Sequence, residues 1–317
     1  MKASSGFSLV EVMVSALLVA LAVGSALTLV AQGRRAHRTA EARARLEESA
    51  RAALDLLSYE VRLAGYQGLL PPGSPVEGST ALGGPSPPGL EAAGGCVASL
   101  ALDFATPVAG ADGDYAAAAG IPLGCPPSPS GRTVPGSDTL VLRRAAVSSG
   151  APASGRLQLE TTRRLGRLVA DGTGSLGPGA AFHDVEVSVF YVSQDSTGSP
   201  GHPSLRRKRL VGGTSPVFQD EELVPGIGDL QVEASLAPGE EAGMPPGAYV
   251  PIGEVPAGAR IATLRLWVLV QGDLADGASE GRPALAYANR AWPTRSSRQA
   301  RAVASRIIEP RNAGARR

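Results

Sequence analysis

The sequence is poor in the residues from which most catalytic and metal sites are built. Its 317 residues include three histidines and two cysteines, and aromatic residues account for 4%. The formal net charge is +1, so the chain as a whole is neither a general polyanion-binding protein nor an acidic one. Glycine (40) and proline (26) are abundant. This composition predicts a loop-rich globular region with a modest core, in one sizeable domain or two small ones.

Sequence motifs give no support for an enzyme. Residues 172–177 match G-x-G-x-x-G, but Pro178 and Gly179 follow directly, so the glycines do not open the helix that a dinucleotide site needs. Asp112 and Asp114 lack the remaining ligands of an EF-hand loop. The sequence also lacks a nucleophile motif, a zinc-binding helix and a phosphate loop. We therefore expect no enzyme, no cofactor and no metal.

A long apolar segment occupies residues 7–31 and reads FSLVEVMVSALLVALAVGSALTLVA. It contains one charged residue and no proline. As a helix it would be about 38 Å long, whereas the hydrocarbon core of a bilayer is about 30 Å thick. The segment is therefore long enough to cross a membrane.

Three interpretations of this segment are open, and they differ in whether they explain Glu11, its one charged residue. A cleaved secretory signal is one, since small residues precede a cleavage point after Ala26. A plain membrane anchor is the second. Neither explains Glu11, because a carboxylate inside a membrane costs about 2.5 kcal/mol or more. The third interpretation uses the neighbouring residues, in which a short leader, MKASSG, ends at Gly6 and Phe7 follows.

The string GFSLVE, followed by an unbroken apolar run, resembles the class III signal of type IV prepilins and pseudopilins. The resemblance implies that a prepilin peptidase cleaves between Gly6 and Phe7 and methylates the new amine of Phe7. It also implies that Glu11, the fifth residue after cleavage, neutralises the α-amine of a neighbouring subunit. Residues 7–31 would then remain on the mature protein, first in the inner membrane and later in the core of a fibre.

The orientation in the membrane is predicted differently by two arguments. Arg34, Arg35 and Arg38 outnumber Lys2, so the positive-inside rule favours a cytoplasmic location for the arginines. The prepilin motif requires the leader on the cytoplasmic face, where its peptidase acts. We follow the motif and expect a single-pass protein with its globular head in the periplasm.

Residues 32–65 continue as an amphipathic helix without proline. Apolar residues recur at spacings of three and four, which is typical of a helix with one buried face. They are Leu46, Ala50, Ala53, Leu57, Val61 and Ala64. Gly65 is the predicted stop. One helix from Phe7 to about Ala64 would be about 87 Å long.

The segment RARLEESARAALDLLSYEVRLAGYQG, residues 43–68, is similar to the corresponding part of PilW-type minor pilins, with its "L–R–AGY–G" ending. The phrase VSVFYVSQDS followed by LRRKRL also resembles these proteins. The resemblance implies a minor pilin that helps to initiate the type IV pilus and supports twitching motility. The implied partners are other minor pilins, the major pilin, the prepilin peptidase, the assembly platform and, as a further candidate, a tip adhesin. Alternatives are a type II secretion minor pseudopilin and a DNA-uptake pilin.

The remainder divides into a loop-rich region (66–137), a β-rich head (138–290) and an arginine-rich C-terminal segment (291–317). Alternating apolar residues predict strands in the head. They cover residues 138–143, 156–160, 185–192, 230–234 and 261–270. We expect an α+β fold, in which the long N-terminal helix packs on an antiparallel sheet of four or five strands.

Cys96 and Cys125 are the two cysteines. In an exported protein a disulfide between them is the favoured interpretation, and two unrelated buried thiols are the alternative. A loop of this size gives a stabilisation of roughly 3 to 4 kcal/mol in the chain-entropy model.

A compact basic run consists of Arg206, Arg207, Lys208 and Arg209, and nine arginines against Glu309 follow from residue 282. Such a surface meets the electrostatic requirement of a DNA contact. Aromatic residues that could stack on bases are scarce near these arginines, so a solvated strand end and a frayed terminus are favoured over nucleic-acid binding.

Overall fold

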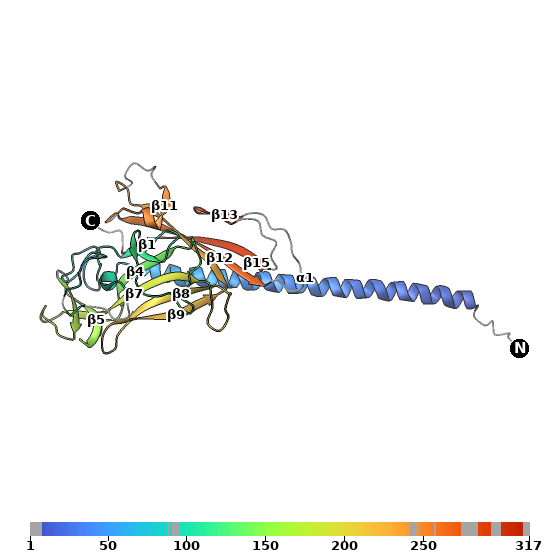
Figure 1. Cartoon of the computed structure of the whole chain (residues 1–317), viewed down its shortest axis with the longest axis horizontal. Coiled ribbons are helices and arrows are strands. Elements are labelled where there is room, and N and C mark those ends of the chain that lie inside the picture. The colour runs from blue at the N-terminus through green and yellow to red at the C-terminus, as the bar shows by residue number, and fades with distance from the viewer. Residues whose placement is uncertain are drawn as a thin grey trace.

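The computed structural model describes residues 8–87, 89–90, 96–240, 245, 247–256, 258–273, 285–292 and 299–312. One helix, α1 (Leu9–Leu63), extends from a β-rich head at the other end of the molecule (Figure 1). Its 55 residues correspond to about 82 Å. The predicted continuous helix is therefore confirmed over the described residues.

The end of α1 is set by a glycine, as the sequence predicts. Ala64 donates its backbone N–H to the carbonyls of Glu60 and Val61, which closes the last turn. Gly65 then adopts a left-handed conformation with φ +78°, which glycine adopts without steric cost. The chain leaves the helix axis at this point and enters the head.

The described strands are all paired antiparallel. A seven-stranded sheet contains the central path β1-β4-β7-β5-β6, with β8 next to β7 and β9 next to β8. Its strands are β1 (Val108–Ala111), β4 (Thr139–Ala145), β5 (Ser154–Thr161), β6 (Gly166–Asp171), β7 (Ala181–Ser193), β8 (Ser204–Val211) and β9 (Val217–Pro225).

A second, four-stranded sheet has the order β11-β10-β12-β15. Its strands are β10 (Ile227–Leu236), β11 (Tyr249–Pro251), β12 (Ile261–Asp273) and β15 (Gln299–Ile308). Two small hairpins and two short 3-10 helices complete the described elements. They are β2 (Ala116–Ala118) with β3 (Ile121–Pro122), β13 (Leu285–Tyr287) with β14 (Arg290–Trp292), η1 (Ala98–Ala101) and η2 (Ile252–Glu254).

The seven-stranded sheet is buried on both faces, and β7 shows this most directly. Val185, Val187 and Val189 lie in one core cluster with the segment around η1. Phe190 and Val192 lie in the other, with α1 and the four-stranded sheet. These three valines therefore share one face of the sheet. The second buried face explains why residues between the predicted positions are also apolar.

The apolar stripe of α1 is confirmed as the face that meets the head. Leu46, Ala50, Ala53, Leu57, Val61 and Ala64 are all buried in the first core cluster, together with Leu54. This cluster contains residues of both sheets, including Leu142 of β4 and Leu266 of β12. The α+β class is confirmed, but one sheet of four or five strands is wrong. The helix packs against a core shared by two sheets.

The C-terminal boundary predicted at residue 290 does not hold. Residues 299–308 form β15, which pairs with β12 from Leu264↔Ile308 to Asp273↔Gln299. Ala300 and Ile308 are buried in the same cluster as α1. This arginine-containing strand is therefore an integral part of the head, because its alternate residues fill the core beside the helix.

The disulfide between Cys96 and Cys125 is formed. It joins the start of η1 to the chain after β3, next to the backbone hydrogen bond from Val97 N–H to the Leu123 carbonyl at 2.9 Å. Cys125 belongs to the second core cluster. The predicted pairing is confirmed, and the loop that it closes holds the surface region between η1 and β3 against the seven-stranded sheet.

Replacing Cys125 by serine is expected to lower the free energy of unfolding by roughly 3 kcal/mol. The two cysteines are 29 residues apart in the sequence, and without the disulfide the unfolded chain regains the conformational entropy of this closed loop. Urea denaturation of the full chain in detergent, with and without a reducing agent, measures this difference. Reduction should destabilise the wild type and leave the variant unchanged. Equal stability of oxidised and reduced wild type would contradict the prediction.

Candidate functional site

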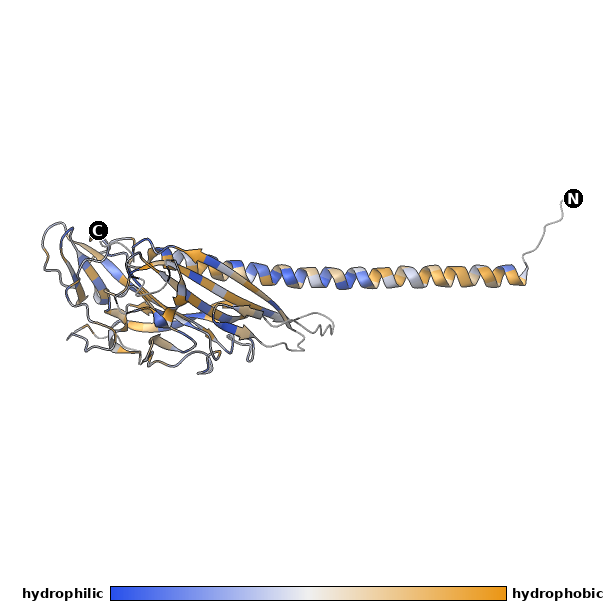
Figure 2. Ribbon diagram, turned by 90° about the horizontal axis from the view of Figure 1, so that it is seen from above, coloured by the Kyte–Doolittle hydropathy of each residue, from blue (hydrophilic) through white to orange (hydrophobic). Residues whose placement is uncertain are grey.

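The first half of α1 is an exposed apolar rod. Residues 9–31 are all exposed in the described chain, and the helix includes a window long and apolar enough to cross a membrane. Figure 2 shows the hydrophobic colour concentrated in this half and mixed colours nearer the head. In a monomeric protein in water such a surface is strongly unfavourable, so this rod requires a lipid or protein environment.

Glu11 lies in the first turn of α1, where its N–H donates to the Ser8 carbonyl at 3.0 Å. Among the residues that the structure describes, none forms an ion pair with Glu11. The partial positive charge of a helix N-terminus favours a carboxylate there, but it does not replace a counter-ion in an apolar environment. Gly6 and Phe7, the predicted cleavage and methylation residues, lie outside the described residues.

The AGY turn after α1 connects the helix to the seven-stranded sheet. Gly65 donates its N–H to the Arg143 carbonyl at 2.9 Å, and the Tyr66 carbonyl accepts from Ala145 at 2.7 Å, so the turn lies along β4. Tyr66 meets His183 edge to face, with 6.2 Å between ring centroids.

Gly68 approaches the same histidine ring. It has φ +65°, and a Cβ at this position would lie 2.6 Å from the ring of His183. Together with Gly65 and Tyr66, this close approach gives the "AGY–G" pattern a structural cause: one glycine turns the chain, the tyrosine packs on His183, and the second glycine lets the backbone pass.

Glu60 joins α1 to the head through a buried charge network. Its carboxylate accepts from Arg207 at 3.0 Å and from Arg144 at 3.4 Å. Arg144 also pairs with Glu186, and Arg207 with Glu221 at 2.6 Å. Glu60 is not among the site residues predicted from the sequence, because a glutamate within a charged helix has no local signature of burial.

The basic run Arg206–Arg209 lies on β8 and faces an acidic strand. The register pairs Arg206 with Glu222, Arg207 with Glu221 and Lys208 with Asp220 of β9. Side chains form the same pairs, with Arg206–Glu222 at 2.9 Å, Arg207–Glu221 at 2.6 Å and Lys208–Asp220 at 3.0 Å. These cations are neutralised inside the protein.

The hypothesis that Arg206, Arg207 and Lys208 contact DNA is therefore not supported, and Arg209 is the exposed member of the run. The prediction of a solvated strand end is also wrong for the other three residues, because an antiparallel strand of opposite charge covers them. The complementary strings LRRKRL and FQDEEL in neighbouring strands are the sequence signal that could have predicted this pairing.

Burial, hydrogen bonds and neighbouring charges shift the pKa values of two residues in this network. Burial lowers the pKa of Arg206, but its hydrogen bond to Asp220 and the charges around it outweigh burial and raise the pKa overall. The pKa of Tyr191 is raised by burial and by its hydrogen bond to Asp220. Arg206 therefore stays charged and Tyr191 stays neutral at physiological pH, so the network acts as a fixed structural element.

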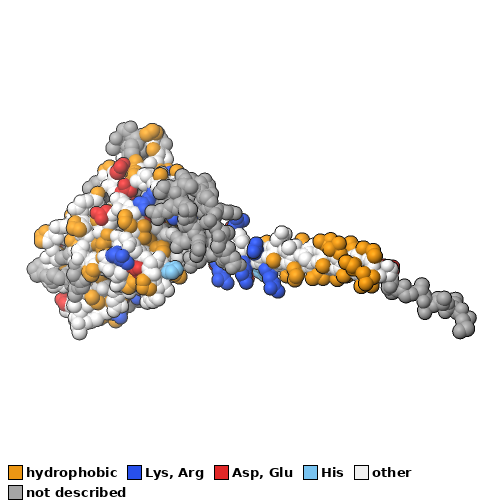
Figure 3. Space-filling view, turned by 45° about the vertical axis from the view of Figure 1, so that its right-hand side comes forward, with side chains coloured by type: hydrophobic (Ala, Val, Ile, Leu, Met, Phe, Trp, Pro, Cys, Tyr) orange, Lys and Arg blue, Asp and Glu red, His pale blue; other side chains and the backbone are white. Residues whose placement is uncertain are grey.

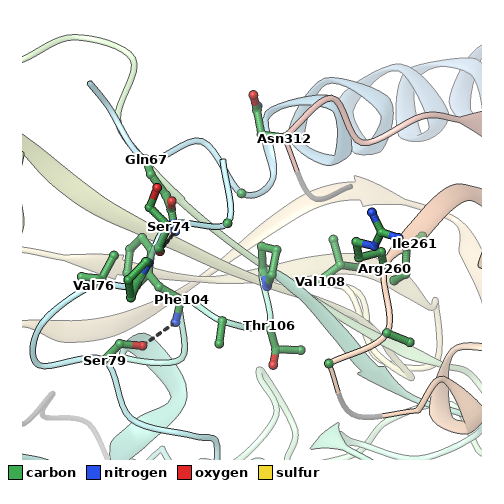
Figure 4. Close-up of a pocket in the computed structure, with 17 residues that line it drawn as sticks. Gln67, Ser74, Val76, Ser79, Phe104, Thr106, Val108, Arg260, Ile261 and Asn312 are labelled. Carbon is green, nitrogen blue, oxygen red and sulfur yellow. Dashed lines mark hydrogen bonds between the residues drawn. The ribbon is translucent and has the colours of Figure 1, made fainter. Parts of the chain in front are cut away.

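A cleft of about 660 Å³ lies beside the AGY turn, between Gln67, the segment 104–108 and residues 258–261. Figure 4 shows small and polar side chains around it, with Ser79 accepting a hydrogen bond from the Phe104 N–H. Arg260 is the charged residue among the described lining residues, and it pairs with Glu240 at 2.9 Å. The described residues contain no group that could hold a metal ion. The described lining contains the hydroxyls of Ser74, Ser79 and Thr106, but no carboxylate or imidazole that could activate one of them as a general base.

Comparisons with known proteins found matches to two family models. Residues 189–312 match the family model for the Type IV Pilus-assembly protein W, PilW. Residues 1–27 match the prokaryotic N-terminal methylation motif. A type IV-like pilin from Thermus thermophilus is similar at 15% identity and a TM-score of 0.30, over 56% of this chain and 79% of that chain. No curated protein matches the chain.

An exposed apolar helix that continues into an α+β head, together with the methylation motif, is the arrangement of a type IV pilin. With the match over residues 189–312, these findings support a PilW-like type IV pilin. The resemblance stated from the sequence is confirmed. Membership of this class indicates a structural rather than a catalytic protein.

Proposed function

We propose that this protein is a minor pilin that is incorporated in the type IV pilus and helps to initiate its assembly, in a priming or tip complex. The observation that carries the proposal is Glu11, a carboxylate without an ion-pair partner in the described chain, at the start of an exposed apolar helix. A buried carboxylate is stabilised by a counter-ion. The α-amine of a second pilin subunit supplies one.

The proposed sequence of events follows from this helix. A prepilin peptidase cleaves between Gly6 and Phe7 and methylates Phe7, and the subunit waits in the inner membrane with its head in the periplasm. The assembly platform then extracts it into the fibre, where the apolar half of α1 packs among other pilin helices. Glu11 neutralises the terminal amine of a neighbour as the helices come together.

Replacing Glu11 by alanine is expected to leave cleavage and methylation intact and to reduce incorporation at least about tenfold, because an unpaired terminal amine in the apolar fibre core costs about 2.5 kcal/mol or more. Immunoblotting of sheared pili against membranes measures incorporation, and mass spectrometry measures processing. Glu41→Ala is the matched control, since Glu41 is exposed on the same helix beyond the apolar segment. Unchanged assembly of Glu11→Ala would refute the proposal.

Deleting the gene distinguishes a role in the pilus from a role in the secretion apparatus. Loss of surface pili and of twitching, with normal protein secretion, supports the minor pilin. Loss of secretion with normal pili would assign the protein to a type II secretion pseudopilin instead.

A further inference from the structure

The cleft beside the AGY turn offers the head a contact that does not depend on apolar area. On the face of the molecule that Figure 3 shows, hydrophobic side chains gather along the rod and lie scattered over the head. The volume of the cleft is about 660 Å³, and ligand sites commonly measure about 300 to 1,000 Å³. None of the functions argued above uses this cleft.

The cleft follows an open edge of the seven-stranded sheet. β1 is the first strand in the sheet order and pairs with β4. Beyond the start of β1, the AGY turn continues along β4. The Arg143 N–H donates to the Pro107 carbonyl at 2.9 Å, and the Arg143 carbonyl accepts from the Gly65 N–H at 2.9 Å. The AGY turn and β1 therefore lie along the same edge of β4, and residues of both line the cleft.

Val108 presents its backbone at this edge. In an antiparallel pair, successive residues alternate between bonding to the neighbouring strand and pointing away from it. Because Pro107 bonds to Arg143, the N–H and C=O of Val108 point away from β4, and no described residue bonds to either group. Further along β1, η2 covers the edge, since a Cβ on Gly253 would lie 2.9 Å from the Asp112 nitrogen. The open part of the edge is therefore the start of β1.

Gln67 supplies a second unused hydrogen-bonding group. It lines the cleft and is 2% exposed. Its Nε2 donates to the Ser74 carbonyl at 3.4 Å, whereas its Oε1 has no partner among the residues that the structure describes. A buried acceptor without a donor lowers stability. A ligand that brings an N–H to this oxygen would remove that penalty.

The lining favours an uncharged ligand of little bulk. Arg260, the charged residue of the described lining, pairs with Glu240. Phe104 is 5% exposed, so it offers little ring surface on which a sugar could stack. A polypeptide backbone carries both the donor that Gln67 lacks and the donor and acceptor that Val108 can pair with. Much of the remaining lining is small, namely Gly65, Gly73, Ser74, Ala105, Gly258 and Ala259.

We propose that this cleft binds an extended, uncharged segment of another protein chain, which adds a short strand to the edge of β1. One residue of the segment exchanges backbone hydrogen bonds with Val108, and a further N–H of the segment donates to Gln67 Oε1. In strand addition the main chain gives affinity, and pockets for alternate side chains give specificity. The inference goes beyond the proposed function and is independent of Glu11, because the cleft lies wholly in the head.

Photo-cross-linking of the full-length protein in the cells that produce it tests the contact. Ala105, an exposed residue of the lining, is replaced by benzoylphenylalanine. Thr214 is the control position, because it is exposed in the turn after β8 and lies outside the lining. We expect a cross-link to another protein from position 105 and none from position 214. Mass spectrometry should place the cross-link in an uncharged segment of the partner.

Gln67→Leu distinguishes a binding group from a structural one. Cross-linking should fall about fivefold, which is the effect of one net hydrogen bond. The head should keep or raise its melting temperature, because the acceptor has no donor in the free protein. Gln158→Leu is the matched control, since Gln158 is also 2% exposed but its Oε1 accepts from the Ala153 N–H at 2.8 Å. It should lower the melting temperature and leave the cross-link of the folded protein unchanged.

A proline scan of the identified partner segment tests whether it binds as a strand. Alternate N–H groups of a paired strand face its neighbour, and proline lacks this group. Proline should therefore abolish the cross-link at alternate positions of the segment. Loss at every position, or at none, would exclude strand addition.

Three further results would overturn the inference. Equal cross-linking from positions 105 and 214 would exclude a specific partner at the cleft. A cross-link from position 105 to residues 313–317 of the same chain would assign the cleft to that segment instead. A lower melting temperature of Gln67→Leu with an unchanged cross-link would make Gln67 a structural residue. Each result is compatible with normal incorporation into pili, so the proposed function is tested separately by Glu11→Ala.

Discussion

Replacing Leu57 by alanine is expected to lower the free energy of unfolding of the head by about 3 kcal/mol. Leu57 is fully buried on α1 and belongs to the core cluster that both sheets share. Removing three methylene-sized groups from such a site costs their transfer free energy and leaves a cavity that rigid strands fill only in part. This is the largest effect that we expect from one apolar substitution on the helix.

Urea denaturation of the full chain in detergent micelles, followed by tryptophan fluorescence, measures the effect. Tyr59→Ala is the matched control, because Tyr59 is two residues away on the same helix and 59% exposed. The control should change stability by less than about 0.5 kcal/mol. A loss below 1 kcal/mol for Leu57→Ala would mean that α1 is not part of the cooperative core.

Replacing Glu60 by glutamine is expected to cost about 2 to 3 kcal/mol, because it removes the negative charge between the buried Arg144 and the half-buried Arg207. Arg144 and Arg207 would keep one acidic partner each, Glu186 and Glu221, so the penalty stays below that of an isolated buried charge. The helix would lose its ionic connection to β4 and β8 and keep only its apolar contacts.

Asp55→Asn provides the control for Glu60→Gln in the same denaturation experiment. Asp55 lies on the same helix as Glu60 and pairs with Arg306 of β15, but the Asp55 side chain is 60% exposed. Exposed ion pairs contribute less than about 1 kcal/mol. Similar effects of the two substitutions would show that the Glu60 network contributes no more than a surface ion pair.

Leu57 and Glu60 lie one helical turn apart and attach the same end of α1 to the head by different means. Burial of Leu57 is non-directional, whereas the arginines of β4 and β8 fix the rotation of the helix through Glu60. In the proposed function, force applied to the membrane half of α1 reaches the head through these contacts. A destabilised junction would therefore lower incorporation even with Glu11 intact.

The sequence by itself determined the long helix and its division into an apolar half and an amphipathic half. The length of the apolar segment, the position of Glu11, the stripe from Leu46 to Ala64 and the stop at Gly65 are local patterns. Such patterns follow from the helical period and from the conformational freedom of glycine, which need no information from the rest of the chain. The strands with alternating apolar residues, such as β7 and β12, were predictable for the same reason.

Tertiary structure alone decided the two-sheet arrangement and the partners of the charges. Strands β8, β9 and β15 carry charged residues at positions where alternation predicts apolar ones. These strands were therefore not predicted from the alternation of apolar residues. Glu60 meets Arg207 across 147 residues of chain. A charge on a helix looks the same in sequence whether it faces water or an arginine from a distant strand, because only the folded chain brings the partner within reach.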